Sequence, residues 1–297
     1  MMTCRQTGLP IIAALAITLV THAEAPQQIT LPPELVDSLD LAPPALRYVP
    51  REACCGAELG TIYEIPGRST DRYPLFVTGS HIGIQVSPAV QQPVSPGAIP
   101  SPPSLRLVAT GAAGGDVFRI EILAGAAIAG RFIASDGLVL EAVSDRAPSS
   151  TPDAQTIVTG LEGFSAEFSK DPPPAGTMYR VAPARQQERL KSMRYLLRAA
   201  DGLSSTRRLR PDRDPEYLNF IKQWSIWTRL EQWDLREFGD TFTNLTRKNL
   251  ESAKQSWTRD VEQRVRALVP GRWGDVQTVL TTADVLAAGP LVNAPRK

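Results

Sequence analysis

The stretch that organises this chain is residues 217–268, which opens as Tyr217-Leu-Asn-Phe-Ile-Lys-Gln-Trp-Ser-Ile-Trp. Four of the five tryptophans lie between Trp224 and Trp257. Apolar side chains recur here mostly at steps of three and four residues, a spacing that places them on one side of a helix. They are Phe220, Trp224, Trp227, Leu230, Phe238, Phe242, Leu245, Leu250, Ala253, Trp257, Val261, Val265 and Leu268. Because Gly239 interrupts the pattern, the sequence predicts two amphipathic helices that meet near residues 238–240.

Helical patterns also flank this stretch. Residues 183–201 place Leu190, Met193 and Leu197 on one side, and Gly202 is expected to end that helix. A polar joint at 204–215 follows. Pro270-Gly271 is expected to end the second helix of the central stretch, before a weaker helix at 275–288. Residues 183–297 are therefore predicted to form a helical domain.

Residues 61–181 are typical of short strands instead. Phe118, Ile120 and Ile122 alternate with charged residues, and Gly, Pro, Ser and Asp separate successive runs. The expected strands are 61–65, 75–77, 82–86, 105–109, 117–123, 129–133, 138–143, 156–158, 164–168 and 178–181. Turn signals at intervals of about ten residues indicate an antiparallel sandwich or barrel. We expect an α+β protein, with an antiparallel β-sandwich-like domain at 51–182 followed by the helical domain.

The first residues have the composition of a secretory signal. Arg5 precedes a run of twelve apolar residues at 9–20, and small residues suit cleavage after Ala23. A bilayer crossing needs about 20 apolar residues, which disfavours the alternative of a retained anchor. The sequence therefore predicts a signal peptide at 1–23, a proline-bearing lead-in at 24–50, and a periplasmic or secreted product without a transmembrane segment.

The net charge of +1 conceals an asymmetry. Residues 24–182 carry 10 basic and 17 acidic side chains, whereas residues 183–297 carry 21 basic and 14 acidic ones. Opposite charges on the two halves can attract each other within one molecule or direct a partner to one end. The sequence favours the intramolecular attraction.

Cys54 and Cys55 are the only cysteines after the predicted signal. Exported cysteines are usually oxidised, yet adjacent Cα atoms lie only ~3.8 Å apart, which is short for a disulfide. The pair fits a strained vicinal disulfide, two intermolecular bridges, or a thiol site for a metal or redox reaction. The first interpretation is favoured, because there is no Cys-x-x-Cys spacing and no second cluster of ligands. No metal and no cofactor are expected.

Motifs of catalysis are missing from the sequence. There is no Gly-x-Ser-x-Gly elbow, Walker loop or His-Glu-x-x-His. His81 follows Ser80 on a predicted strand, where neighbouring side chains point to opposite faces. Paired carboxylates can hydrolyse glycosides without histidine, and Asp116, Glu121, Asp136 and Glu141 lie on or beside predicted strands. Their spacing does not distinguish catalysis from outward-facing strand positions.

Two features are candidates for binding. Arg207, Arg208, Arg210 and Arg213 could grip phosphate, lipid headgroups or acidic glycans, although Asp212 and Asp214 make a solvated joint the favoured interpretation. Trp233 falls off the main apolar stripe, so an exposed ring there could stack on a sugar or pack on a partner helix. The predicted export disfavours nucleic acid as a partner.

From residue 46 to about 183 the order of features resembles the maltose-operon periplasmic protein family. The features are Cys54-Cys55, then Phe76-Val-Thr-Gly-Ser80, Phe118, the run Leu138-Val-Leu-Glu-Ala-Val-Ser-Asp145, and Met178-Tyr-Arg-Val181. The resemblance implies a periplasmic, non-catalytic β-domain linked to envelope or sugar-uptake systems, and it carries over no catalytic residue.

Together these observations predict an exported, non-catalytic envelope protein that binds a protein or glycan partner. One alternative is a histidine-poor, carboxylate-based glycan hydrolase. Another is an accessory subunit of an envelope-spanning secretion or transfer assembly, with the helices as its docking element.

Overall fold

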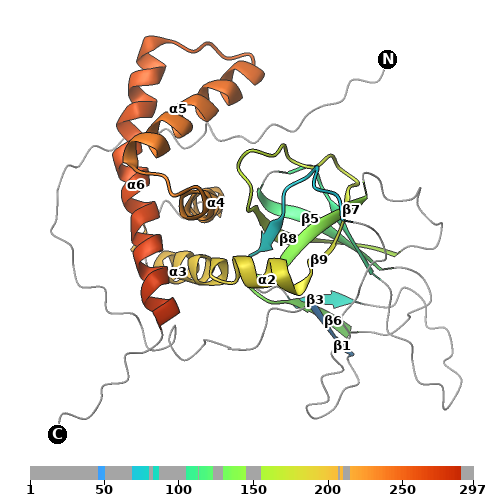
Figure 1. Cartoon of the computed structure of the whole chain (residues 1–297). Helices are drawn as coiled ribbons and strands as arrows, with labels where there is room; N and C mark the ends of the chain where they lie inside the picture. The colour runs from blue at the N-terminus through green and yellow to red at the C-terminus, as the bar shows by residue number, and fades with distance from the viewer. Residues whose placement is uncertain are drawn as a thin grey trace, which may run out of the picture.

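The computed structural model describes residues 46–50, 69–79, 83–86, 105–112, 114–122, 130–144, 155–206, 208–209 and 215–288. Within these ranges every strand precedes every helix (Figure 1). The α+β class and the C-terminal helical region are therefore as the sequence predicts.

Six strands close into an antiparallel barrel. In spatial order they are β2 (Phe76–Thr78), β7 (Val139–Ser144), β9 (Met178–Val181), β4 (Leu105–Ala109), β5 (Gly114–Ile122) and β8 (Gln155–Ser165). The sheet closes because the short strand β2 pairs with β7 on one side and with β8 on the other.

The prediction of a β-sandwich-like domain is thus wrong, and the domain is a closed barrel. Alternating apolar residues show that one side of each strand is buried. They do not show whether that side faces a second sheet or the far wall of the same sheet. The register of β5 against β8 shifts twice, between Asp116 and Phe118 and between Arg119 and Ile120. Shifts of this kind mark β-bulges or similar irregularities, which bend a strand.

A smaller sheet lies beside the barrel, in the order β1 (Leu46–Pro50), β6 (Gly130–Ala134) and β3 (Gly83–Val86). Residues 46–50 were expected to belong to the lead-in, but they pair antiparallel with β6. The expected strand at 61–65 lies outside the described residues. The strand expected at 156–158 and the first two residues of the one expected at 164–168 belong to a single strand, β8, which ends at Ser165.

Aromatic rings fill the barrel. Phe76, Phe118 and Tyr179 are fully buried and meet edge to face, with ring centroids 4.9–5.6 Å apart. Gly163 makes room for them, because a Cβ there would lie 2.8 Å from the Phe118 ring. Burial raises the pKa of Tyr179 above its usual range, and its hydroxyl donates to the carbonyl oxygen of Pro74 at 3.3 Å. The interior is therefore a packed core and not a channel.

The helices are α2 (Ala184–Leu190), α3 (Met193–Ser205), α4 (Pro215–Glu231), α5 (Leu235–Ser252) and α6 (Arg259–Ala288). Several predicted boundaries are wrong. The helix expected at 183–201 is two helices, α2 and α3, and Gly202 lies inside α3. Gly239 lies inside α5, and the break falls at 232–234 instead.

Local chemistry explains the corrected boundaries. Asp234 caps α5: its carboxylate accepts from the N–H of Glu237 at 2.8 Å, while the Glu237 carboxylate accepts from the N–H of Asp234 at 3.1 Å. Pro270 was expected to end a helix but lies within α6. Its ring is exposed, so water can satisfy the carbonyl that proline leaves without a donor.

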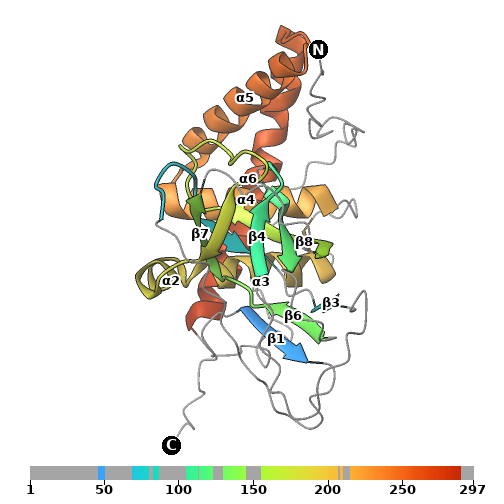
Figure 2. The same cartoon turned by 90° about the vertical axis from the view of Figure 1, so that its right-hand side faces the viewer.

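The helices pack on the outside of the barrel (Figure 2). Val77, Val139 and Phe164 share one apolar cluster with residues of all five helices, whereas the ring cluster fills the interior. Two glutamines extend the contact, because the amide of Gln187 pairs with the backbone of Val139, and that of Gln223 with Ser165, at 2.8–2.9 Å. The two halves therefore share one core.

Candidate partner-binding surface

Helix α5 and the N-terminal half of α6 form a hairpin that extends beyond the barrel in both views (Figures 1 and 2). Its root is held by the aromatic core, since Phe238 and Phe242 pack on Trp224 with centroids 4.9 and 5.6 Å apart. Farther out, the apolar residues are only partly buried: Leu245, Leu250, Trp257 and Val261. The outer part of the hairpin thus rests mainly on contacts between its own two helices.

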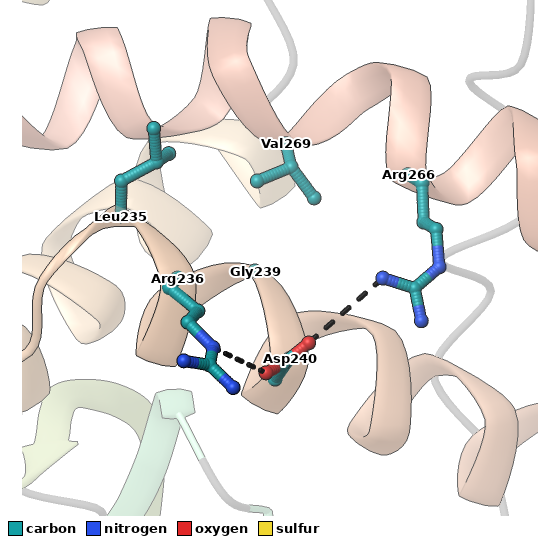
Figure 3. Close-up of a pocket in the computed structure, with 6 residues that line it drawn as sticks. All are labelled: Leu235, Arg236, Gly239, Asp240, Arg266 and Val269. Carbon is teal, nitrogen blue, oxygen red and sulfur yellow. Dashed lines mark ion pairs between the residues drawn. The ribbon is translucent and has the colours of Figure 1, made fainter.

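A groove of about 220 Å³ lies between α5 and α6 at the root of the hairpin (Figure 3). Six residues line it: Leu235, Arg236, Gly239, Asp240, Arg266 and Val269. Leu235 is 47% exposed, and Leu268, which directly precedes the lining residue Val269 in the sequence of α6, is 37% exposed. Among the described residues, these two and Val285 are the large apolar side chains that are most open to solvent.

Gly239 lines the groove without a side chain of its own. A Cβ at this position would lie 3.0 Å from Cγ1 of Val269, so the absence of a side chain lets α5 and α6 approach closely. On α6, Pro270 cannot donate an N–H to the carbonyl of Arg266, four residues earlier. A backbone acceptor is therefore left beside the groove.

The groove carries charges of both signs. Asp240 lies between Arg236 and Arg266, at 4.0 and 3.8 Å (Figure 3). Both ion pairs are long, and both are exposed to solvent: the side chain of Arg236 is 91% exposed and that of Arg266 is 55% exposed. Pairs of this kind contribute about 0–1 kcal/mol. Arg266 also donates from Nε to Oε1 of Glu262 at 2.9 Å, so Arg236 is the guanidinium that can turn to another carboxylate at little cost.

A buried ion cluster fixes the helices that support the hairpin. Lys222 of α4 is 1% exposed, and its Nζ lies 2.8 Å from Asp201 of α3 and 3.2 Å from Glu162 of β8. Burial raises the pKa of Asp201, and the nearby Lys222 partly offsets this. The cluster joins two helices to the barrel wall, and sequence reasoning missed it because its members are distant along the chain.

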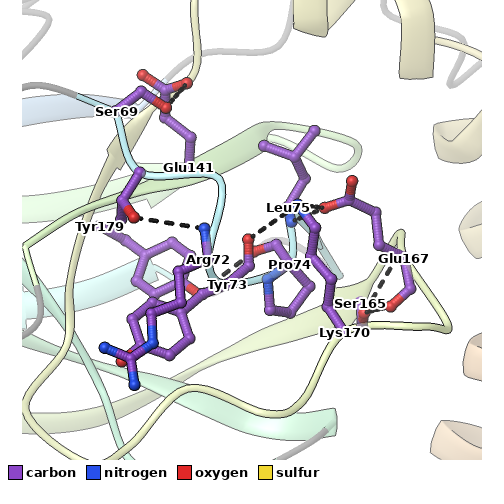
Figure 4. Close-up of polar contacts among 11 residues, drawn as sticks. Ser69, Arg72, Tyr73, Pro74, Leu75, Glu141, Ser165, Glu167, Lys170 and Tyr179 are labelled. Carbon is purple, nitrogen blue, oxygen red and sulfur yellow. Dashed lines mark hydrogen bonds and ion pairs between the residues drawn. The ribbon is translucent and has the colours of Figure 1, made fainter.

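Two of the four carboxylates suggested for glycan hydrolysis, Glu141 and Asp136, form ion pairs with arginines. Glu141 accepts from Arg180 on the neighbouring strand at 2.7 Å. It also accepts from Ser69 at 3.1 Å, a contact that Figure 4 shows. Asp136 lies 3.3 Å from Arg198 of α3. Asp116 is exposed, and the side chain of Glu121 lies outside the described part. None of the four lines the groove.

Figure 4 also shows how the segment before β2 is fixed. The N–H of Leu75 donates to Glu167 at 2.9 Å, and Lys170 forms an ion pair with the same carboxylate at 3.0 Å. These polar groups hold a loop against the barrel, which is a structural task.

The predicted binding residues lie in different environments. Trp233 is partly buried, with its ring 5.0 Å from Phe168 and 5.8 Å from Trp224, so it belongs to the aromatic core. Arg208 is exposed. Arg207, Arg210 and Arg213 lie outside the described residues, as do Cys54, Cys55, His81 and the predicted signal peptide.

Within the described ranges, no group of three or more His, Cys, Asp or Glu side chains is placed to hold a metal ion. Among the helices in those ranges, none combines the length and apolar character that a membrane crossing requires.

The chain matches no protein-family model, no curated protein and no solved structure. The resemblance to the maltose-operon periplasmic family therefore stays a prediction.

Sequence reasoning also missed the groove. Leu268 was placed on the apolar stripe of a helix, and Leu235 was not singled out. The available signal was the charge pattern around Leu235, since Arg236 and Asp240 are four residues apart on the same helical face. Arg266 joins them only through the fold.

Proposed function

We propose that this chain is an exported envelope protein that carries out no turnover and binds a protein partner through the groove between α5 and α6. The observation that carries the proposal is the projecting hairpin, which presents Leu235 to solvent beside Arg236 and Arg266 in the groove and exposes Leu268 on α6. Exposed apolar side chains rimmed by charge are typical of protein-binding surfaces.

The chemistry of the groove specifies the partner. Leu235 and Val269 favour aliphatic side chains, and the exposed Arg236 favours a carboxylate, to which arginine can donate two parallel hydrogen bonds. An acidic, aliphatic helix or extended segment meets both requirements. A glycan is less well suited, because Trp233, the ring suggested for sugar stacking, packs on Phe168 and Trp224.

The accessory role in a secretion or transfer assembly is the second candidate. The projecting hairpin favours it, because a docking element must reach beyond the body that carries it. The two candidates differ in the partner, which is a free envelope protein in one case and a subunit of a membrane-attached assembly in the other. No arrangement among the described carboxylates favours hydrolysis.

Site-specific photo-crosslinking in the native cell tests the binding surface. A photoreactive residue at Leu235 should give one discrete adduct, whereas the same residue at Val285, which is equally exposed at 47% but distant along α6, should not. The partner identified from that adduct, once purified, should bind at least tenfold more weakly to the variant R236E/R266E. Binding to R247E/R264E, which alters exposed arginines of the same hairpin outside the groove, should be unchanged.

Equal adducts at Leu235 and Val285, or a partner that binds R236E/R266E as tightly as the parent chain, would contradict the proposal. Export has a separate test. The product in the periplasmic fraction should begin at Glu24, and a cytosolic product that retains residues 1–23 would contradict export.

A further inference from the structure

The outer half of the α5–α6 hairpin gathers exposed cations that form no ion pair with another side chain of the described part. They are Arg247 and Lys248 of α5, Lys254 of the connecting turn, and Arg259 and Arg264 of α6. The guanidinium of Arg264 donates to a backbone carbonyl, that of Asp260, at 3.3 Å. Three cations on α3 and α4, by contrast, lie 2.6–3.3 Å from carboxylates: Arg198, Lys222 and Arg229.

These cations give the outer hairpin a local surplus of positive charge. Residues 247–266 hold six basic and three acidic side chains. Arg266 and Glu262 pair with each other at 2.9 Å, which leaves five basic and two acidic side chains. The remaining acidic residues, Glu251 and Asp260, therefore leave a surplus of three positive charges. The whole chain has a net charge of only +1, so the surplus is a property of this region.

The surplus lies at one end of the molecule. Helix α5 rises ~18 Å from Asp240, in the groove, to its last residue, Ser252. The hairpin extends beyond the barrel in both views (Figures 1 and 2). Residues 24–182, which include the barrel, carry the acidic excess. The fold thus separates a basic tip from an acidic body, so a negatively charged surface would attract the molecule by its tip.

An aromatic ring lies among the cations of the tip. Trp257 is partly buried in the turn that joins α5 to α6, and its neighbours Gln255, Ser256 and Thr258 are exposed and uncharged. Tryptophan is enriched at the boundary of water and lipid, because its ring is apolar and its N–H is polar. A narrow, projecting tip that combines cations with tryptophan is suited to a flat, anionic surface.

We propose that the tip of the hairpin, residues 247–264, docks on an anionic lipid bilayer. The ammonium and guanidinium groups donate to lipid phosphates, and Trp257 enters the layer of headgroups. Each cation close to such a surface strengthens binding about fivefold, so a surplus of three favours an anionic over a neutral bilayer about a hundredfold.

This contact is distinct from the groove at the root of the hairpin. The ~18 Å that separate them exceed the screening length of ~8 Å at physiological salt, so charges at the tip act weakly on a partner in the groove. The tip can therefore rest on lipid while the groove holds a protein.

Cosedimentation of the purified chain with vesicles tests the proposal. The parent chain should bind vesicles of phosphatidylcholine and phosphatidylglycerol at least tenfold more tightly than vesicles of phosphatidylcholine alone. This binding should weaken at least tenfold between ~0.1 M and ~1 M salt, because the screening length falls from ~10 Å to ~3 Å. R247E/R264E should bind the anionic vesicles at least tenfold more weakly than the parent.

R185E/R189E is the matched control. Arg185 and Arg189 are exposed on α2, and the two reversals change the net charge by the same amount as R247E/R264E. This variant should bind anionic vesicles like the parent, because its charges lie away from the tip. Circular dichroism should show the same helix content for both variants, since all four arginines are exposed.

Photo-crosslinking locates the contact. A photoreactive residue at Gln255, which is exposed in the turn, should give adducts with lipid in anionic vesicles. The same residue at Val285, near the end of α6, should give none.

Equal binding to anionic and neutral vesicles would overturn the proposal, as would equal losses in R247E/R264E and R185E/R189E or lipid adducts at Val285 alone. Binding of the tip to polyglutamate but not to anionic vesicles would identify an acidic protein as its partner and would overturn the proposal too. The groove is judged separately, because the Leu235 adduct to a protein should persist in R247E/R264E whether or not the tip binds lipid.

Discussion

Lys222 is a fully buried cation with two carboxylates, and this cluster makes the junction of barrel and helices specific. Replacing Lys222 with methionine keeps most of the volume but leaves Asp201 and Glu162 without their cation. The two carboxylates left behind are 34% and 22% exposed, so the loss should lie below the ~3–5 kcal/mol of a fully buried pair, at about 1–3 kcal/mol. Urea unfolding at pH 7 should show a loss of this size.

K191M is the control for that measurement. Lys191 pairs with Glu188 on an exposed face of the chain, so its loss should change the free energy of unfolding by less than about 0.5 kcal/mol. Equal effects of K222M and K191M would show that the buried cluster has no special role in stability.

Asp201 gives the cluster a pH dependence whose sign can be derived. Burial raises its pKa in the folded state, so the folded chain binds this proton more tightly than the unfolded chain does. Its contribution to stability is full below the pKa of an unfolded aspartate, ~3.9, and is lost as the pH rises through the raised value.

The substitution D201N removes the titrating carboxyl group. The free energy of unfolding of D201N, relative to that of the parent, should therefore increase from pH 4 to pH 7. Urea midpoints at several pH values measure this difference. A difference that stays constant over this range, or that shrinks as the pH rises, would contradict the assignment.

Helix α5 depends on its N-terminal cap. Asp234 and Glu237 satisfy each other's backbone N–H groups at the sharp turn between α4 and α5, where Gln232 has a φ of 56°. The substitution D234A should therefore destabilise the chain by about 0.5–2 kcal/mol. The effect should appear as faster amide hydrogen exchange in the first turn of α5.

K248A is a suitable control for D234A, because Lys248 is exposed within the same helix and has no part in the cap. Unchanged exchange in D234A, or the same acceleration in K248A, would show that the cap does not hold the helix.

The helices also show what sequence periodicity can predict. The apolar stripe of 217–268 correctly indicated helices, but their boundaries depended on capping and exposure. The capping box Asp234-Leu-Arg-Glu237 was visible in the sequence, yet Gly239 was taken as the break. Pro270 was expected to end a helix, but its exposed position lets α6 continue. Glycine and proline alone were therefore poor guides to boundaries here.

Closure of the barrel and formation of the groove depend on the whole molecule. Most strands were predicted within one or two residues, and β4 and β9 match their predicted bounds. The pairing of β2 with both β7 and β8 is a long-range choice that no local pattern encodes. For the same reason, Arg266 could not be placed beside Arg236 from the sequence.

The shared core predicts that the two halves unfold together. All five tryptophans lie in the helical half, at 224, 227, 233, 257 and 273, so their fluorescence reports on the helices alone. The amide infrared band of the strands reports on the barrel. Because Val77, Val139 and Phe164 pack against the helices, both signals should give one urea midpoint. Two separate midpoints would show that the barrel folds without its helical cover.

The central claim is that the α5–α6 groove binds another protein chain. Amide hydrogen exchange of the full chain, measured alone and in complex with the partner captured at Leu235, tests it most directly. The account predicts slower exchange at 235–240 and 266–269, with the amides of β5 and β8 unchanged. Protection confined to the barrel, with exchange in the hairpin unaltered, would contradict it.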